Sequence, residues 1–323
     1  SRSNLQTNPF GGSARLTNVE AMWVHGGSGS DYFRAADGQV NFWGNAGDDT
    51  LIGGPLGDHL DGGSGSNLIE AGSGDDHLGL GWGYDRNSID AAPGGKLSLL
   101  RWNNTVDGGE GSDAVNYSFW DMERAVEFSS AFVPGQSQYL QNHPFGVDFL
   151  SGVERVEING GRGADRLRGD PGFNNIQGGG GNDTLTGSGG GDEYRYDLNM
   201  ELGRDLITDF DLPGSYLRFW NGPVDRLFVN VDSATLRRGE ANVTKFDANS
   251  VLFQLGRDDQ PGADLEILLI GETLSLAGFV LRIDPWGTNL VHSAQVKAKG
   301  TDQNERFEGS PFDDSIDGGG GND

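Results

Sequence analysis

The chain has 323 residues, of which 55 are glycine and none is cysteine, and its 48 acidic and 23 basic residues give a net charge of −25. The lack of cysteine excludes disulfides and cysteine-ligated zinc, and so acidic a chain argues against nucleic acid or an anionic membrane as a partner. No stretch approaches the roughly 18 apolar residues of a membrane span.

Residues 1–25 are predicted to be lead-in strands, and at Gly26 a nine-residue repeat begins that runs to Ser88. Each repeat has a turn, mostly rich in glycine, then a polar residue at position six and an apolar residue at position eight, with exceptions at Val40 and Asn87. Glycine permits the tight turn, and strand alternation points position eight inward. Two repeats make one 18-residue coil, so segment 26–88 is predicted to be an all-β, calcium-stabilised parallel β-roll (β-solenoid).

The rest of the chain repeats this organisation. Segment 89–149 is predicted to be a β-rich insert with one isolated repeat that starts at Gly108, and segment 150–196 a second β-roll block. Segment 197–290 is predicted to be a β-sandwich-like insert, because apolar alternation is regular there. Segment 291–323 is predicted to start a third block that stops within a repeat, so we expect both ends to lie inside a longer chain.

The acids at position six are predicted to bind several Ca²⁺ ions. An 18-residue coil places position six of one repeat beside position six two repeats later, and two carboxylates with turn carbonyls suit calcium better than magnesium or zinc. One buried apolar residue per repeat contributes about 2 kcal/mol, against an ordering entropy on the order of 10 kcal/mol, so folding should require the metal. The predicted ligands are Asp31, Asp49, Asp58, Asn67, Asp76, Asp85, Asp165, Asn174, Asp183, Asp192, Glu305, Asp314 and Asp323.

The coil length also predicts which ligands are neighbours. A slot between Val40 and Asp58 should be empty or shared, because valine offers no side-chain ligand. The alternative is an array of glycine-rich loops in which the acids make only local Asx turns. The expected pairs are Asp31–Asp49, Asp58–Asp76, Asp165–Asp183, Asn174–Asp192 and Glu305–Asp323, with Asp49–Asn67 and Asn67–Asp85 as weaker versions.

The runs GGSGSDYFR, GGRGADRLR and GGGGNDTLT, which start at Gly26, Gly160 and Gly178, resemble the RTX repeats of secreted bacterial proteins. This resemblance implies a parallel β-roll, calcium-driven folding outside the cell and export through a type I secretion channel. Val40, Asn67 and Asn174 depart from the repeat because they replace acids, which leaves calcium occupancy of their slots open.

No nucleophile elbow, HExxH motif or phosphate loop is present, so we expect this chain not to be an enzyme. We expect a secreted structural protein of the cell surface or extracellular matrix: a segment of a surface layer, a filament or a large adhesin. Its expected partners are calcium, copies of itself and surface glycans. Two alternatives remain, namely the secretion and folding module of an extracellular hydrolase or toxin, and a glycan-binding adhesin.

Aromatic residues are also predicted on the outer face of the β-roll. His59 and His77 both occupy position seven, 18 residues apart, and should stack as a solvated ladder, because two histidines without a third ligand make a poor metal site. Trp23 and Trp43 should also point outward, to pack against an insert, a neighbouring molecule or a glycan.

Overall fold

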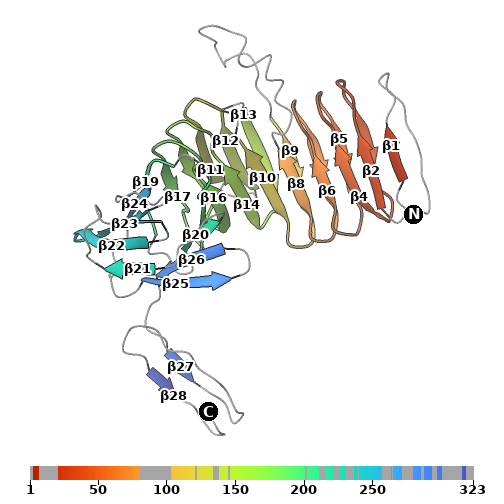
Figure 1. Ribbon diagram of the computed structural model, residues 1–323. Coiled ribbons are helices and arrows are strands. Elements are labelled where there is room, and N and C mark those ends of the chain that lie inside the picture. Colours follow the sequence, from red (N-terminus) through yellow and green to blue (C-terminus); the bar gives the residue numbers. More distant parts are fainter. Residues whose placement is uncertain are drawn as a thin grey trace. The chain divides into compact units, whose positions relative to one another are not determined.

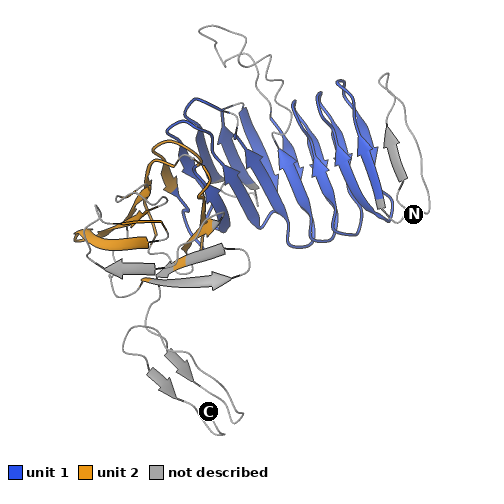
Figure 2. Cartoon of the chain, in the orientation of Figure 1, with its two compact units in different colours: residues 1–178, 186–190 blue, residues 179–185, 191–323 orange. Residues whose placement is uncertain are grey.

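The computed structural model of the chain consists of β-strands, and the part of the chain that it describes contains no helix (Figure 1). It therefore offers no helix, among those residues, that is long and apolar enough to cross a membrane. Two compact units are present: residues 1–178 with 186–190, and residues 179–185 with 191–323 (Figure 2). The described residues are 3–6, 21–80, 103–120, 122–133, 138–144, 146–200, 202–210, 215–220, 226–229, 236–238, 240–256, 263, 265–270, 279–284, 287–292, 297–299 and 315–317.

The first unit is a parallel β-roll, in which successive repeat strands alternate between two sheets. One sheet has the order β1(Ser3–Gln6), β2(Ala21–His25), β4(Gln39–Trp43), β6(His59–Asp61), β8(His77–Leu80), β10(Ala114–Ser118), β14(Arg155–Asn159), β16(Phe173–Gln177). The other has the order β3(Tyr32–Arg34), β5(Thr50–Ile52), β7(Leu68–Glu70), β9(Thr105–Asp107), β13(Gly146–Ser151), β12(Gln138–His143), β11(Glu127–Val133), β15(Arg166–Arg168). The all-β parallel β-roll predicted from the repeats is thereby confirmed.

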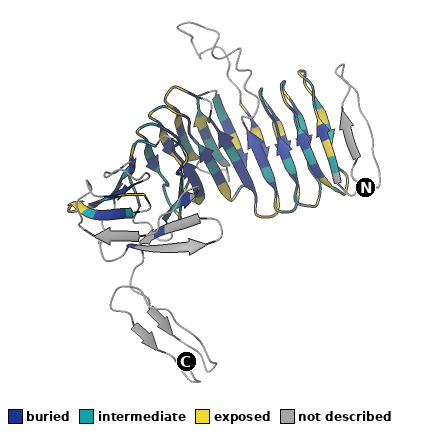
Figure 3. Cartoon of the chain, in the orientation of Figure 1, coloured by how far each residue is buried: buried dark blue, intermediate teal, exposed yellow. Residues whose placement is uncertain are grey.

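Strand register confirms the 18-residue coil. Leu60 of β6 lies between Phe42 of β4 and Leu78 of β8, and in the other sheet Leu51 lies beside Ile69. All five of these position-eight side chains are buried, and the buried and exposed residues that alternate along the strands are seen in Figure 3. The core is therefore the narrow file of apolar side chains that the repeat predicts.

Glycine is required where the turns of neighbouring coils touch. Gly63 has a φ of 70°, and a Cβ added there would lie 2.0 Å from the carbonyl oxygen of Asn45 in the preceding coil. Any side chain at that position would therefore force the two coils apart.

The repeat from Gly108 is a further coil of the same stack, which differs from the isolated repeat expected in an insert. Strand β9 pairs with β7 and strand β10 pairs with β8, both in parallel. Val106 and Val115 continue the two files of buried residues. The repeat from Gly108 retains the turn and the apolar spacing, so it can stack although the sequence between β8 and β9 is longer than one coil. Residues 81–88, the end of the first block, lie outside the described part.

Residues 122–151 also join the β-roll. Strands β11, β12 and β13 form an antiparallel meander, whose outer members pair in parallel with β15 and β9 respectively. The predicted β-rich character of this segment is confirmed, and its strands extend one sheet of the roll.

The second unit contains two sheets with buried Phe219, Phe253 and Ile267. One has the order β18(Glu193–Asp197), β20(Tyr216–Trp220), β26(Gly287–His292), β25(Phe279–Asp284). The other has the order β17(Thr184–Thr186), β19(Arg204–Ile207), β24(Leu265–Ile270), β23(Ser250–Leu255), β22(Glu240–Asp247), β21(Arg226–Val229). A separate parallel pair is formed by β27(Lys297–Lys299) and β28(Ser315–Asp317). The six-segment division drawn from the sequence is finer than these two units, and its boundaries stay predictions.

Candidate metal centre

The position-six residues of one sheet form a continuous chain of hydrogen bonds, which we call the first ladder. The backbone N–H of Asp31 donates to Oδ1 of Asp49 at 2.7 Å, and that of Asp49 donates to Oδ1 of Asn67 at 2.9 Å. The N–H of Asn67 donates to Oδ1 of Asn104 at 2.9 Å, and the N–H of Asn104 donates to Oδ1 of Asp148 at 2.7 Å. Each side chain therefore holds the backbone of the preceding coil.

A second ladder has the same pattern in the other sheet. The N–H of Val40 donates to Oδ1 of Asp58 at 2.8 Å, and the N–H of Asp58 donates to Oδ1 of Asp76 at 2.6 Å. The N–H of Asp76 donates to Oδ1 of Asp113, and that of Asp113 to Oε2 of Glu154, both at 2.9 Å. Valine at position six thus still donates through its backbone, although its side chain adds no ligand.

The same carboxylates also organise their own turns. The N–H of Gly27 donates to Oδ2 of Asp31, and the N–H of Gly54 donates to Oδ2 of Asp58, each at 2.7 Å. These are local turn contacts of the kind expected if the acids only made Asx turns in an array of glycine-rich loops. They occur together with the ladder, so a local turn role and a role between coils are combined in one residue.

Three of the ladder carboxylates have an oxygen that the protein does not satisfy. Oδ2 of Asp49, Oδ2 of Asp76 and Oδ2 of Asp113 are buried and accept no hydrogen bond from the described residues. Burial, together with the nearby charge of Asp31, raises the pKa of Asp49 to about 6, and burial with several acidic neighbours raises the pKa of Asp76 to about 6. A nearby cation would stabilise the ionised form of these buried carboxylates.

The donor set fits calcium. All the ladder side-chain donors are carboxylate or amide oxygens, which calcium prefers and which zinc does not. Within the described ranges no three His, Cys, Asp or Glu side chains converge on one point. The remaining ligands would therefore be backbone carbonyls of the turns, as the sequence analysis expected.

Two asparagines at position six satisfy their turns without a cation. Nδ2 of Asn174 donates to the carbonyl oxygens of Asp170, Gly172 and Gly187 at 2.9, 2.9 and 3.2 Å. Nδ2 of Asn67 makes longer contacts of 3.4 and 3.5 Å to the carbonyls of Gly63 and Gly65. In both repeats the amide group donates to turn carbonyls, and the assignment of Asn67 and Asn174 as calcium ligands stays a prediction.

The structure brings together most of the pairs predicted in the first block. Asp31 lies beside Asp49, Asp49 beside Asn67, and Asp58 beside Asp76. The predicted pair Asn67–Asp85 differs, because Asn104 occupies the place next to Asn67. The reason is that the next coil of that sheet is formed by β9, and Asp85 itself lies outside the described residues.

The predicted ligands of the second block are buried as well. Asp165 accepts hydrogen bonds from the N–H of Val126 and of Gly161, both at 2.7 Å. The pairs Asp165–Asp183 and Asn174–Asp192 each join residues of different units, and these two pairs stay predictions. Glu305, Asp314 and Asp323 lie outside the described residues.

In the second unit, the predicted ligands again sit beside polar acceptors. The N–H of Asp183 donates to Oδ1 of Asp205 at 2.9 Å, and the N–H of Asp192 donates to Oγ of Ser215 at 3.3 Å. Asp183 and Asp192 are both buried. The ladder pattern is therefore present in this unit too.

Sequence reasoning missed several residues that act in the ladders. One signal was available for all of them: a polar residue stands two positions before a buried aliphatic residue, as Asn104 stands before Val106 and Asp148 before Leu150. Asp113 is position six of the repeat that starts at Gly108, whereas the other missed residues stand outside the nine-residue repeats. The missed residues are Asn104, Asp113, Asp148, Glu154 and Asp205.

A family profile described as the RTX calcium-binding nonapeptide repeat matches the chain in four copies, at residues 25–56, 52–86, 159–194 and 299–323. The chain carries RTX calcium-binding repeats. Repeats of this family bind Ca²⁺ ions, and they imply a secreted, extracellular protein of the type I export route. The ladder residues Asp31, Asp49, Asp58, Asn67 and Asp76 lie within the matched copies, and their role as calcium ligands stays a prediction.

No curated protein matches the chain. Among solved structures it is similar to the extracellular lipase LipA from Serratia marcescens, with 15% identity and a TM-score of 0.23. The alignment covers 81% of this chain and 39% of the lipase, so this chain spans less than half of that protein's length.

Proposed function

We propose that this RTX chain is a calcium-stiffened structural segment of an extracellular surface layer, filament or large adhesin. The observation that carries the proposal is the continuity of the two ladders in the first unit. They join coil to coil from Asp31 to Asp148 in one sheet and from Val40 to Glu154 in the other. A stack held along its whole length in this way resists bending and local opening.

The negative charge of the ladder carboxylates is the physical reason for the proposed requirement for calcium. Successive carboxylates along a ladder repel one another, and their burial adds to the cost of ionisation. Bound calcium supplies the positive charge that neutralises them. The chain should therefore stay disordered where calcium is scarce and become rigid outside the cell, where a structural segment has to work.

We propose further that this stretch of chain has no catalytic activity of its own. Buried acids of the ladders hold the backbone of neighbouring coils, as Asp58 and Asp76 do. The rival proposal, a folding module attached to a hydrolase, requires a catalytic domain in another part of a longer protein.

Assembly is the experiment that tests the structural role. Purified protein would be titrated with calcium and followed by light scattering and negative-stain electron microscopy, with magnesium as the control ion. The proposal expects regular sheets or filaments with calcium and none with magnesium. A protein that folds with calcium yet stays monomeric at every concentration, or that hydrolyses ester or peptide substrates, would contradict it.

A further inference from the structure

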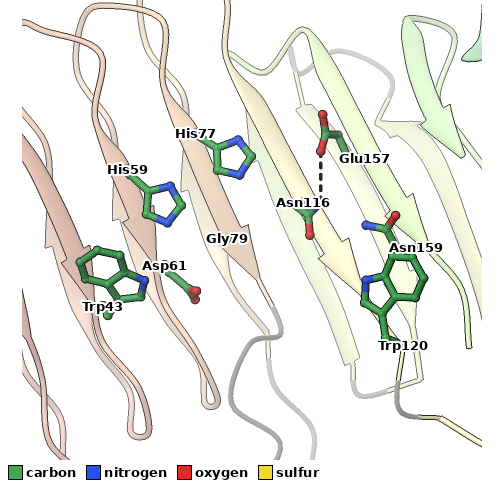
Figure 4. Close-up of a pocket in the computed structure, with 9 residues that line it drawn as sticks. All are labelled: Trp43, His59, Asp61, His77, Gly79, Asn116, Trp120, Glu157 and Asn159. Atoms are coloured by element: carbon green, nitrogen blue, oxygen red, sulfur yellow. Dashed lines mark hydrogen bonds between the residues drawn. The ribbon is translucent and has the colours of Figure 1, made fainter. Parts of the chain in front are cut away.

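A hollow lies on the outer face of the β-roll, on the sheet that contains β4, β6, β8, β10 and β14 (Figure 4). Its volume is about 320 Å³, and all of its lining residues belong to the first unit. The ladders lie at the turns between strands, whereas this hollow lies over the strands. It is thus separate from the calcium ligands.

Strand register shows that the floor of the hollow is a straight row. Trp43, Asp61, Gly79, Asn116 and Glu157 are successive partners across five neighbouring strands. Adjacent strands lie about 4.8 Å apart, so the row from Trp43 to Glu157 is roughly 19 Å long. The hollow therefore has the form of a trough that runs across the strands.

An aromatic side chain is held at each end of the trough (Figure 4). The ring of Trp43 stacks on His25 with centroids 4.4 Å apart and meets His59 at 5.4 Å. His59 in turn stacks on His77 at 5.1 Å, as the sequence predicted for two position-seven residues. Trp120, in the turn after β10, lies at the other end. These contacts fix Trp43, and an indole ring fixed by its neighbours binds a flat apolar face with little loss of side-chain entropy.

The floor of the trough between the two tryptophans is polar. Oδ1 of Asn116 is buried and has no hydrogen-bond partner among the described residues, while its Nδ2 donates to Oε2 of Glu157 at 3.1 Å. In the middle of the floor the Asp61 side chain lies over Gly79, because a Cβ there would come within 2.9 Å of the Asp61 carboxyl carbon. An unsatisfied acceptor in a hollow indicates a missing donor group, such as a hydroxyl of a ligand.

The lining also restricts the charge of the ligand. Among the described residues, it contains the carboxylates of Asp61 and Glu157 and no lysine or arginine. An acidic ligand would be repelled, and a metal ion lacks a third ligand within the described residues. A ring with an apolar face and several hydroxyl groups matches both the tryptophans and the polar floor.

We propose that this trough binds an oligosaccharide that carries no acidic groups. The sugar rings lie along the row of residues, with their apolar faces on Trp43 and Trp120 and with a hydroxyl donating to Oδ1 of Asn116. The two carboxylates are separated by three strand spacings, roughly 14 Å, which exceeds the roughly 5–10 Å of glycosidase pairs. The trough therefore binds sugar without hydrolysing it.

A glycan array probed with the whole chain in excess calcium tests the proposal. The array would carry neutral, amino-sugar and uronic-acid oligosaccharides. We expect binding to neutral or amino-sugar glycans, and a loss of roughly tenfold or more in affinity for Trp120→Ala, as expected for an aromatic contact of about 1.5 kcal/mol. Asn116→Ala should weaken the same glycans, and Tyr32→Ala, which removes an exposed ring from the other sheet, should leave binding unchanged.

Circular dichroism with calcium would verify that each variant is folded. If Trp120→Ala does not fold, Asn116→Ala is used to test the proposal. Binding of no glycan, a preference for uronic acids, or unchanged affinity in both folded variants would overturn the proposal. These outcomes are distinct from failure of the structural role, which is judged by assembly in the absence of sugar.

Discussion

The backbone N–H of Asp58 donates a hydrogen bond of 2.6 Å to Oδ1 of Asp76, eighteen residues later in the chain. Oδ2 of the same Asp76 carboxylate is buried and accepts no hydrogen bond from the described residues. One side chain therefore holds the preceding coil with one oxygen and leaves the other for a cation.

Replacement of this side chain should weaken the β-roll more than loss of an exposed acid. Asp76→Ala leaves the N–H of Asp58 without its acceptor, which should cost about 1–3 kcal/mol, and it should raise the calcium concentration needed for folding. Glu70→Ala is the control, because Glu70 is exposed on β7 and should cost less than about 0.5 kcal/mol. Calcium titrations followed by circular dichroism give both values. Equal midpoints for the two variants would show that the ladder does not hold the coils.

Without calcium, the fold should gain order as the pH falls. The folded-state pKa of Asp49 and of Asp76 is raised from 3.8 to about 6, chiefly by burial. A raised pKa means that the folded state binds protons more tightly, so this stabilisation is present below 3.8 and is lost as the pH rises through about 6. Protein stripped of calcium on a chelating resin should show more β signal by circular dichroism near pH 4 than near pH 7. A double variant, Asp49→Asn with Asp76→Asn, should show a weaker dependence, and a β signal that falls on acidification would contradict the assignment.

Asn174→Asp should convert a neutral turn into one that needs a cation. The substitution removes the three hydrogen bonds that Nδ2 donates to turn carbonyls and adds a buried charge. We expect lower stability without calcium and a higher number of bound calcium ions per chain, measured by calorimetry and by elemental analysis. Asn199→Asp is a control outside the turns of the β-roll repeats. An unchanged ion count with unchanged calcium-free stability would contradict the role given to Asn174.

Each leucine should contribute to the free energy of unfolding in proportion to the burial of its side chain. Leu60 is 0% exposed and lies between Phe42 and Leu78, so Leu60→Ala should cost about 2–5 kcal/mol in saturating calcium. Leu56 is 49% exposed in a turn, and Leu56→Ala should cost less than about 1 kcal/mol. Chemical denaturation of the calcium-bound protein measures both. A similar loss for both leucines would mean that the file is not the core of the fold.

The repeat made the β-roll predictable because it links turn, ligand and core in nine residues. Leu51 and Leu60 lie inside, and His59 and His77 stack outside, as the period requires. The coil formed by Thr105–Asp107 was not predictable in the same way, because the nine-residue period does not continue to it, and strand pairing rather than the repeat sets the next neighbour of Asn67.

The trough also could not be predicted from the sequence. Trp43, Gly79 and Glu157 are far apart in the chain, and the local pattern around each of them predicts only an outward position on a strand. Their alignment follows from the register of β4, β6, β8, β10 and β14.

Removal of the metal tests the central claim most directly. The purified chain would be dialysed exhaustively against EGTA near pH 7, above the raised pKa of about 6 of Asp49 and Asp76, and its far-ultraviolet circular dichroism would be recorded before and after calcium is restored. We predict loss of the β signal in EGTA and its full return with calcium but not with magnesium. An unchanged β spectrum in EGTA would contradict the claim that calcium between the ladder carboxylates holds the coils together.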